Sequence, residues 1–179
     1  AKHHRRVAVA HTMRFSPVVM HLRRAVSEGL IGDLRELRAY GKQDNRAGGE
    51  DMMVLGTHLF DLMRAFAGEA RSCTARVLQD GRDITIGDRR QVKDNVGWVA
   101  GNQVSAQFAF DGGVNATFTS DARLRETVGR WGLELHGSRG VARILCDLSP
   151  RVLVQSTTGW TPDGRLDTWW AFEPSLAVS

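Results

Sequence analysis

Two stretches of alternating apolar and polar residues, joined by a short glycine turn, constrain the fold of this 179-residue chain more than any other feature. Residues 104–110 and 114–119 each carry a hydrophobic side chain at every second position, which is the period of a β-strand with one buried face. Asp111-Gly112-Gly113 lies between them and is typical of a tight hairpin turn. The sequence therefore predicts two antiparallel strands here, at the heart of a larger sheet.

Two helices are predicted on the N-terminal side of this hairpin. Ser16-Pro17 followed by apolar residues at helical spacing indicates a helix that ends near Gly29. Residues 52–66 predict a mostly buried helix that ends at Gly68. Further strands are expected at 7–10, 34–42, 72–79, 131–136, 141–145 and 151–156, with the polar residues 80–97 leaving the sheet as a flap or arm.

The order of these elements predicts a fold of the α+β class, formed by one domain over residues 1–179. Strands that follow one another through hairpins favour an open, largely antiparallel β-sheet with helices on one face, and disfavour a parallel dinucleotide-binding sheet. The uncovered face would then be a surface for binding or oligomerisation. Four aromatic residues could lie on either face of the sheet: Trp98, Phe110, Phe118 and Trp131.

Composition excludes several functional classes. Hydrophobic residues make up 42% and charged residues 25%, so the chain is not disordered. A net charge of +4 spread along the chain is a weak field, so no nucleic-acid partner is expected despite a pI of about 9.7. No apolar run approaches the roughly 20 residues of a membrane span, and no signal segment opens the chain. Cys73 and Cys146 fit a reduced, cytoplasmic protein with buried thiols.

The residues 48–63, GGEDMMVLGTHLFDLM, are the strongest candidates for chemistry. They place His58 in an apolar helical run, with Asp61 three residues later on the same helix face. An imidazole beside a carboxylate can exchange protons near neutral pH. A histidine satisfied within the core is the structural alternative. A metal site would also need His11 or His21 and further ligands that the spacing does not specify, so no metal is expected.

Other polar residues offer possible ligand contacts. Arg14 lies between a predicted strand and a predicted helix, where a cation can reach an anionic or polyol ligand, although a surface salt bridge explains it equally well. Asp44-Asn45-Arg46 crowds a loop that ordinary turn chemistry also explains. Asp51 begins a helix, where a carboxylate suits the helix dipole. The sequence contains neither a G-x-G-x-x-G turn nor a G-x-S-x-G nucleophile motif.

Taken in order, several segments resemble the C-terminal domain of the Gfo/Idh/MocA oxidoreductases, a family that includes glucose–fructose oxidoreductase and inositol dehydrogenase. The likeness covers nearly the whole chain. It is carried by HTMRFSP (11–17), EGLIGDL (28–34), GKQDNRAGGEDMMVLGTHLFDLM (41–63), FDGGVNATFTS (110–120) and the turn at 137–140.

This resemblance implies the function of the domain. Family members join an N-terminal Rossmann domain, which binds NAD or NADP, to an α/β domain whose open sheet face packs against another subunit. The Rossmann half and the family's Glu-Lys-Pro motif are absent from this sequence. The chain is therefore expected to be the substrate-binding part of a dehydrogenase acting on a sugar, polyol or cyclitol hydroxyl. It is expected to be inactive alone and to form a homo-oligomer through its sheet.

The resemblance also assigns individual residues. His58 matches the family histidine that takes the substrate's hydroxyl proton, and Asp61 would support the helix or the imidazole. The family aspartate four residues before this histidine is Val54 here, so Asp51, or Asp44 and Arg46, would grip the substrate instead. Arg14 matches an arginine near the cleft between substrate and cofactor. We expect His58, Arg14, Asp44 and Arg46 to converge on one cleft.

The departure at Val54 favours an alternative. In that alternative the chain is a noncatalytic β-sheet module for dimerisation or ligand binding.

Overall fold

The predicted hairpin is the centre of the observed sheet. The computed structural model describes residues 6, 8–124, 131–156 and 168–173. Strand β6 (Gln103–Ala109) pairs antiparallel with β7 (Asn115–Asp121), and Ala106 lies opposite Phe118. Gly112 and Gly113 turn the chain with positive φ angles of 68° and 78°, a conformation that glycine adopts without steric cost.

Within the described part of the chain, nine strands form one mixed sheet in the order β11-β10-β9-β8-β1-β7-β6-β2-β3. Only β1 (Leu34–Tyr40) and β7 run parallel among the described pairs, so the sheet is largely antiparallel, as predicted. The remaining strands are β2 (Ser72–Gln79), β3 (Arg82–Asp83), β8 (Gly132–Gly137), β9 (Val141–Leu145), β10 (Arg151–Gln155) and β11 (Trp170–Ala171).

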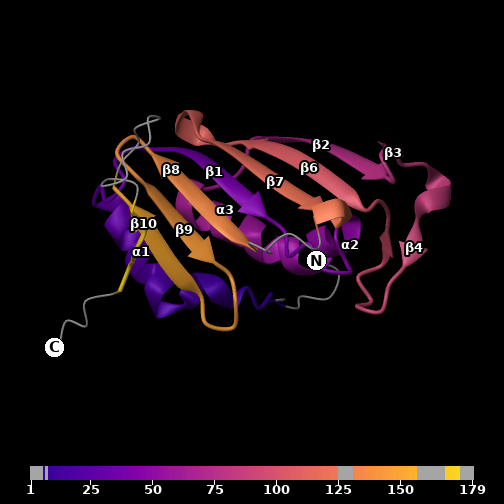
Figure 1. The fold of residues 1–179 in the computed structure, drawn as a ribbon, viewed down its shortest axis with the longest axis horizontal. Helices are drawn as coiled ribbons and strands as arrows, with labels where there is room; N and C mark the ends of the chain where they lie inside the picture. Colours follow the sequence, from indigo (N-terminus) through magenta and orange to yellow (C-terminus); the bar gives the residue numbers. More distant parts are fainter. Residues whose placement is uncertain (1–5, 7, 125–130, 157–167, 174–179) are drawn as a thin grey trace.

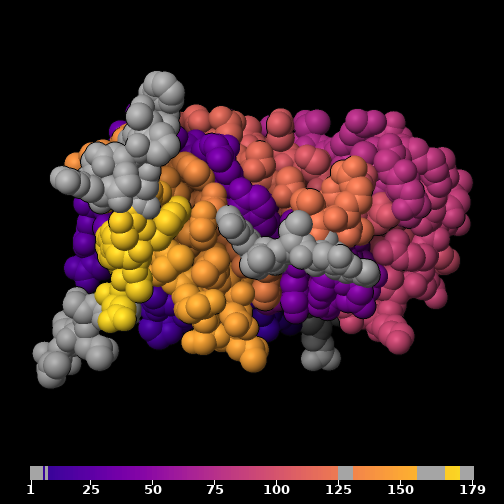
Figure 2. All heavy atoms as spheres, viewed as in Figure 1, coloured from indigo at the N-terminus to yellow at the C-terminus, as the bar shows by residue number. Residues whose placement is uncertain are grey.

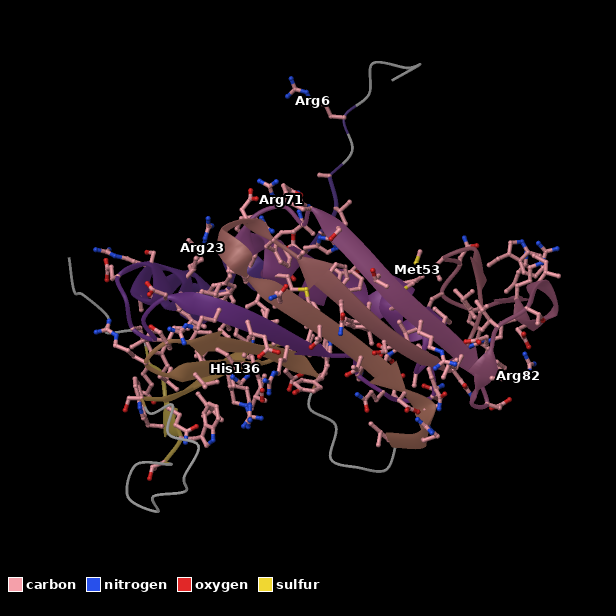
Figure 3. All side chains as sticks on the ribbon, turned by 90° about the horizontal axis from the view of Figure 1, so that it is seen from above. Arg6, Arg23, Met53, Arg71, Arg82 and His136 are labelled. Carbon is pink, nitrogen blue, oxygen red and sulfur yellow. The ribbon has the colours of Figure 1, made fainter. Side chains whose placement is uncertain are left out.

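Helices cover one face of this sheet. Figure 1 shows α1 (Pro17–Ser27), α2 (Gly49–Asp51) and α3 (Thr57–Ala67) behind the strands. The opposite face is turned toward the viewer in Figure 2, where β1 lies between β8 and β7. Arg23 on α1 and His136 on β8 lie on opposite sides of the sheet (Figure 3).

The core lies between the helices and the sheet. Its fully buried side chains come from both layers, because alternate strand residues and one face of each helix point inward. Phe110 and Phe118 belong to this core, while Trp98 is exposed on the arm described below. The largest of the fully buried side chains are Leu22, Ile31, Leu37, Leu59, Leu62, Met63, Phe118, Leu133, Leu135 and Ile144.

The helix predicted over 52–66 contains a turn that the sequence does not indicate. Residues Met52–Gly56 form a π-helical turn between α2 and α3, a feature that is rare and frequent at functional sites. Gly56 packs under the ring of Phe118, and a Cβ added there would lie 3.1 Å from that ring. The turn sets the direction in which α3, and hence His58, leaves α2.

Residues 80–97 form the predicted arm. Only β3 joins the main sheet, and the chain then passes through the 3-10 turn η3 (Ile86–Asp88) before β4 (Arg90–Gln91) pairs with β5 (Trp98–Val99) in a separate two-stranded sheet. No helix of the described residues is long and apolar enough to cross a membrane.

Two local predictions need correction. Residues 8–10 form no strand, because they lead into the 3-10 turn η1 (Thr12–Phe15) without a pairing partner. Cys73 is exposed rather than buried, since β2 lies near the sheet edge, whereas burial raises the pKa of the Cys146 thiol to about 12.

Candidate active site

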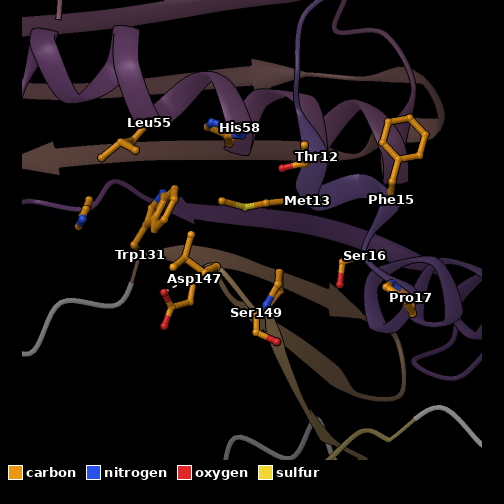
Figure 4. Close-up of a pocket in the computed structure, with 13 residues that line it drawn as sticks. Thr12, Met13, Phe15, Ser16, Pro17, Leu55, His58, Trp131, Asp147 and Ser149 are labelled. Atoms are coloured by element: carbon orange, nitrogen blue, oxygen red, sulfur yellow. Dashed lines mark hydrogen bonds between the residues drawn. The ribbon is translucent and has the colours of Figure 1, made fainter.

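A pocket of about 630 Å³ opens beside the first turn of α3. Figure 4 shows His58 and Leu55 on one side of it, with Trp131 and Asp147 on another. Its walls come from segments far apart in the sequence: η1, the start of α1, the residue after β1, the helix at 55–58, the start of β8 and the loop after β9. The lining residues are Thr12, Met13, Phe15, Ser16, Pro17, Lys42, Leu55, His58, Trp131, Asp147, Leu148, Ser149 and Pro150.

His58 lies between two rings in this pocket. Its imidazole meets His11 edge to face with ring centroids 5.2 Å apart, and Trp131 in the same manner at 6.4 Å. The Nδ1 atom is buried and has no hydrogen-bond partner among the described residues. Burial lowers the pKa of His58, and so does the nearby His11, while the charge of Asp61 offsets part of this effect. The ring is therefore a neutral proton acceptor near neutral pH.

Asp61 is bound by Arg14 and faces His11. Arg14 donates from Nε to the carboxylate at 2.6 Å and from Nη2 to the backbone carbonyl of Asp61 at 2.7 Å. His11 Nδ1 lies 3.5 Å from the other carboxylate oxygen. The Arg14 side chain is thus committed to Asp61, and it lines a neighbouring pocket with Phe15 and Met20 instead of the His58 pocket.

Asp51 is fully buried beneath the loop that follows β1. Its carboxylate accepts a hydrogen bond from the Ser120 hydroxyl at 2.5 Å and from the backbone N–H groups of Lys42 and Gln43 at 3.3 Å each. It does not line the His58 pocket. Its contacts instead fix the backbone that carries Lys42, a pocket residue.

Asp44 and Arg46 bind each other outside the pocket lining. Two nitrogens of the Arg46 guanidinium reach the Asp44 carboxylate at 2.7 and 3.2 Å, and a third reaches Asp94 at 3.3 Å. The hydrogen bonds from Arg46 hold the pKa of Asp44 below its usual value. Of the residues expected to converge, only His58 lines the pocket.

Lys42 connects this charged pair to the pocket and was not singled out from the sequence. Its Nζ lies 3.8 Å from Asp44 and 6.0 Å from the ring centroid of Trp131. A lysine in a polar loop carries no motif, so only the fold reveals its place. His11, Trp131 and Asp147 were likewise not assigned to the site, because their neighbours come from distant segments. Among the described residues, no group of three His, Cys, Asp or Glu side chains could hold a metal ion.

These features define an α+β domain in which a histidine on a helix lines a pocket and one face of the mixed sheet carries no helix. The family model described as the GFO/IDH/MocA C-terminal domain matches residues 19–143, and the chain belongs to this family of oxidoreductase domains. The resemblance seen in the sequence is thereby confirmed. No curated protein matches the sequence.

Solved structures share the fold. Levoglucosan dehydrogenase in complex with NADH and levoglucosan aligns with a TM-score of 0.66 and 18% identity over 93% of this chain and 46% of its own. An inositol dehydrogenase homologue complexed with NAD+ from Azotobacter vinelandii has a TM-score of 0.66 and 11% identity over 96% of this chain and 44% of its own. An oxidoreductase domain protein from Kribbella flavida has a TM-score of 0.63 and 18% identity, over 92% and 46%. The chain spans less than half the length of these three proteins.

Proposed function

We propose that this domain supplies the substrate pocket and the catalytic histidine of an NAD(P)-dependent oxidoreductase that acts on a sugar, polyol or cyclitol hydroxyl. The observation that carries the proposal is the position of the His58 imidazole at the wall of the pocket of about 630 Å³, where burial lowers its pKa. The likeness of the fold to a levoglucosan dehydrogenase and to an inositol dehydrogenase homologue supports the substrate class.

In the oxidation direction, His58 accepts the proton of a substrate hydroxyl as the C–H bond on the same carbon breaks and its electron pair leaves with the hydrogen as hydride. The product is a carbonyl compound and a protonated imidazole. In reduction, the imidazolium returns its proton to the forming alkoxide. A lowered pKa suits this role, because the ring must be unprotonated before oxidation begins.

The nicotinamide cofactor, NAD or NADP, supplies the hydride acceptor when it is bound. The pocket wall fits a flat ring next to His58, since Met13, Leu55 and Trp131 present apolar surface there. The sequence has no G-x-G-x-x-G turn for a dinucleotide pyrophosphate, so most cofactor contacts belong to a separate nucleotide-binding domain.

The remaining predicted site residues act around the pocket in this proposal. Arg14 holds Asp61, and the Asp44 carboxylate, which Arg46 binds, holds the ammonium group of Lys42 at the pocket rim. Asp51 fixes the loop that presents Lys42. Lys42 itself is the polar group of this set that reaches a bound polyol.

A second copy of the chain is proposed to pack on the open sheet face. Polar residues lie across the middle strands of this face, namely Ser105, Thr117 and Thr119. Two aromatic residues share it, because Tyr40 alternates with the core residues of β1 and Trp169 packs on the guanidinium of Arg143. Glu134 is 8% exposed and accepts hydrogen bonds from His136 and Arg143, so the polar groups of this face that a second copy would cover are already paired in part within one chain.

Replacement of His58 tests the catalytic role. In an enzyme that joins this domain to an NAD(P)-binding domain, His58→Ala and His58→Gln are expected to lower kcat for alcohol oxidation by at least about 10²-fold, the usual scale of a lost general base. His21→Gln is the matched control, since His21 is exposed and its ring binds the carbonyl of Pro17. Near-wild-type turnover of the His58 variants would refute the role. The 179-residue chain alone is expected not to reduce NAD+ or NADP+. Reduction by it would contradict the proposal that a separate domain supplies most of the cofactor contacts.

A further inference from the structure

We propose that His11 is a positioning residue for the reaction assigned to His58, and that Asp61 acts on His58 through His11. This inference rests on the proposed function of His58. It assigns a role to a second histidine that lies outside the pocket lining and behind the first.

The first argument is that Asp61 does not bind His58 directly. Nδ1 of His58 is buried without a hydrogen-bond partner among the described residues. The Asp61 carboxylate is 8% exposed, and Arg14 takes one of its oxygens at 2.6 Å. The other oxygen lies 3.5 Å from Nδ1 of His11. Because both oxygens face residues of the segment 11–14, the carboxylate orients that segment.

The second argument is the packing of the rings. The planes of His11 and His58 meet at 69° with centroids 5.2 Å apart, and those of Trp131 and His58 at 83° with centroids 6.4 Å apart. Edge-to-face contacts in this range are favourable and restrict ring rotation. In the absence of a hydrogen bond at Nδ1, His11 and Trp131 are the groups that hold the imidazole plane against the pocket.

The third argument is charge. The titratable and charged groups around His58 are His11 and Arg14 on the segment before α1, Asp61 on α3, Lys42 after β1 and Asp147 after β9. His11 lies between the Asp61 carboxylate, 3.5 Å from its Nδ1, and the His58 ring, with 5.2 Å between the ring centroids, so its electrostatic effect on His58 is exerted at close range. The pKa of His58 is lowered by burial first and by His11 second. His11 therefore helps to keep His58 ready to accept a proton.

Two substitutions separate packing from charge. His11→Phe retains an aromatic edge against His58 and removes the polar ring nitrogens, whereas His11→Gln removes the ring itself. His21→Gln is again the control for loss of a histidine. The first measurement is the pKa of the His58 imidazole by NMR titration of the 179-residue chain, which needs no cofactor and no activity. Thermal unfolding establishes that each variant is folded, and His11→Phe preserves the test if His11→Gln does not fold.

The pKa of His58 is expected to rise in both His11 variants and to stay unchanged in His21→Gln. In an enzyme that joins this domain to an NAD(P)-binding domain, His11→Gln is expected to lower kcat about tenfold with little change in KM, the result of a misaligned proton acceptor. His11→Phe is expected to recover most of kcat at neutral pH, while the acidic limb of its pH profile stays displaced toward higher pH.

The outcomes distinguish this inference from the proposed function. An unchanged pKa of His58 in both His11 variants would overturn the inference. So would a wild-type rate and pH profile in those variants when His58→Ala is inactive, and in that case the function of His58 stands. Full activity of His58→Ala would instead overturn the proposed function.

Discussion

The hydroxyl of Ser120 on β7 donates a hydrogen bond to the buried carboxylate of Asp51, with 2.5 Å between the oxygens. The same hydroxyl oxygen accepts the backbone N–H of Gly48 at 2.9 Å. One serine therefore ties the central hairpin to the start of the helical segment that carries His58. A buried carboxylate needs such donors, because its desolvation is costly.

Loss of this serine is expected to destabilise the domain. Ser120→Ala removes both hydrogen bonds and is expected to lower the free energy of unfolding by about 1–3 kcal/mol, the usual cost of leaving a buried polar group without its partner. Urea denaturation measures the effect, with an unchanged slope and a lower midpoint. Ser105→Ala, on an exposed position of β6, is the matched control and should change the midpoint little. Equal effects of the two substitutions would contradict a stabilising role of the hydrogen bonds made by the Ser120 hydroxyl.

The free energy of unfolding should also be sensitive to substitution of Gly48, where the helical segment packs closely against the chain near residue 101. Gly48 has a φ of +95°, and a Cβ there would lie 2.5 Å from both the Gly101 carbonyl oxygen and the Asn102 Cα. Gly113 has a φ of +78° but open space around it. Gly113→Ala is expected to cost about 1–2 kcal/mol from backbone strain alone, and Gly48→Ala clearly more. Thermal or urea unfolding of the pair isolates the steric part, which is absent if both variants are equally stable.

The fold was predictable where its signals are local. Alternation around Asp111-Gly112-Gly113 specifies a hairpin within about twenty residues of sequence, and Ser16-Pro17 marks the start of α1. The parallel pairing of β1 with β7 was not predictable, because the sequence of one strand does not specify which distant strand it pairs with. The π-helical turn at Met52–Gly56 was missed because its first four residues are all apolar, so they show no period that separates a π-helical turn from an α-helical one.

The site was predictable only in part. The motif around His58 pointed to the residue at the pocket wall, but not to its neighbours. Asp51 was expected to grip the substrate because Val54 stands where the family has its aspartate, and only the pairing with Ser120 shows that the Asp51 carboxylate is buried. Lys42 had no motif, and its place depends on Asp51 and on Trp131 at the start of a strand far along the chain.

The pKa of His58 makes stability depend on pH in a defined direction. Burial holds this pKa below the value of about 6.5 that the ring has in an unfolded chain. Between the two values the unfolded chain binds more protons, so stability rises with pH, is complete above about pH 6.5 and is lost as pH falls toward the folded-state pKa.

His58→Gln is expected to remove this dependence. The free energy of unfolding of the wild type should fall more steeply than that of the variant between about pH 7 and about pH 5. Urea denaturation at several pH values measures both slopes, and His21→Gln, which leaves His58 in place, should follow the wild type. Parallel curves for wild type and His58→Gln would show that the fold does not hold the imidazole neutral.

The open sheet face offers the last test, which concerns assembly. Thr117 lies in the middle of β7, between Arg38 on β1 and Gln107 on β6, and its side chain belongs to the face without helices. If a second copy packs there, Thr117→Lys places an ammonium group in the contact next to Arg38, and both its desolvation and the like charge oppose association. Sedimentation velocity is expected to show oligomers of the wild type and mainly monomers of Thr117→Lys. Ser27→Lys adds the same charge at the exposed end of α1 and should leave assembly intact. A monomeric wild type, or a variant that associates as strongly as the wild type, would remove the open face from the interface.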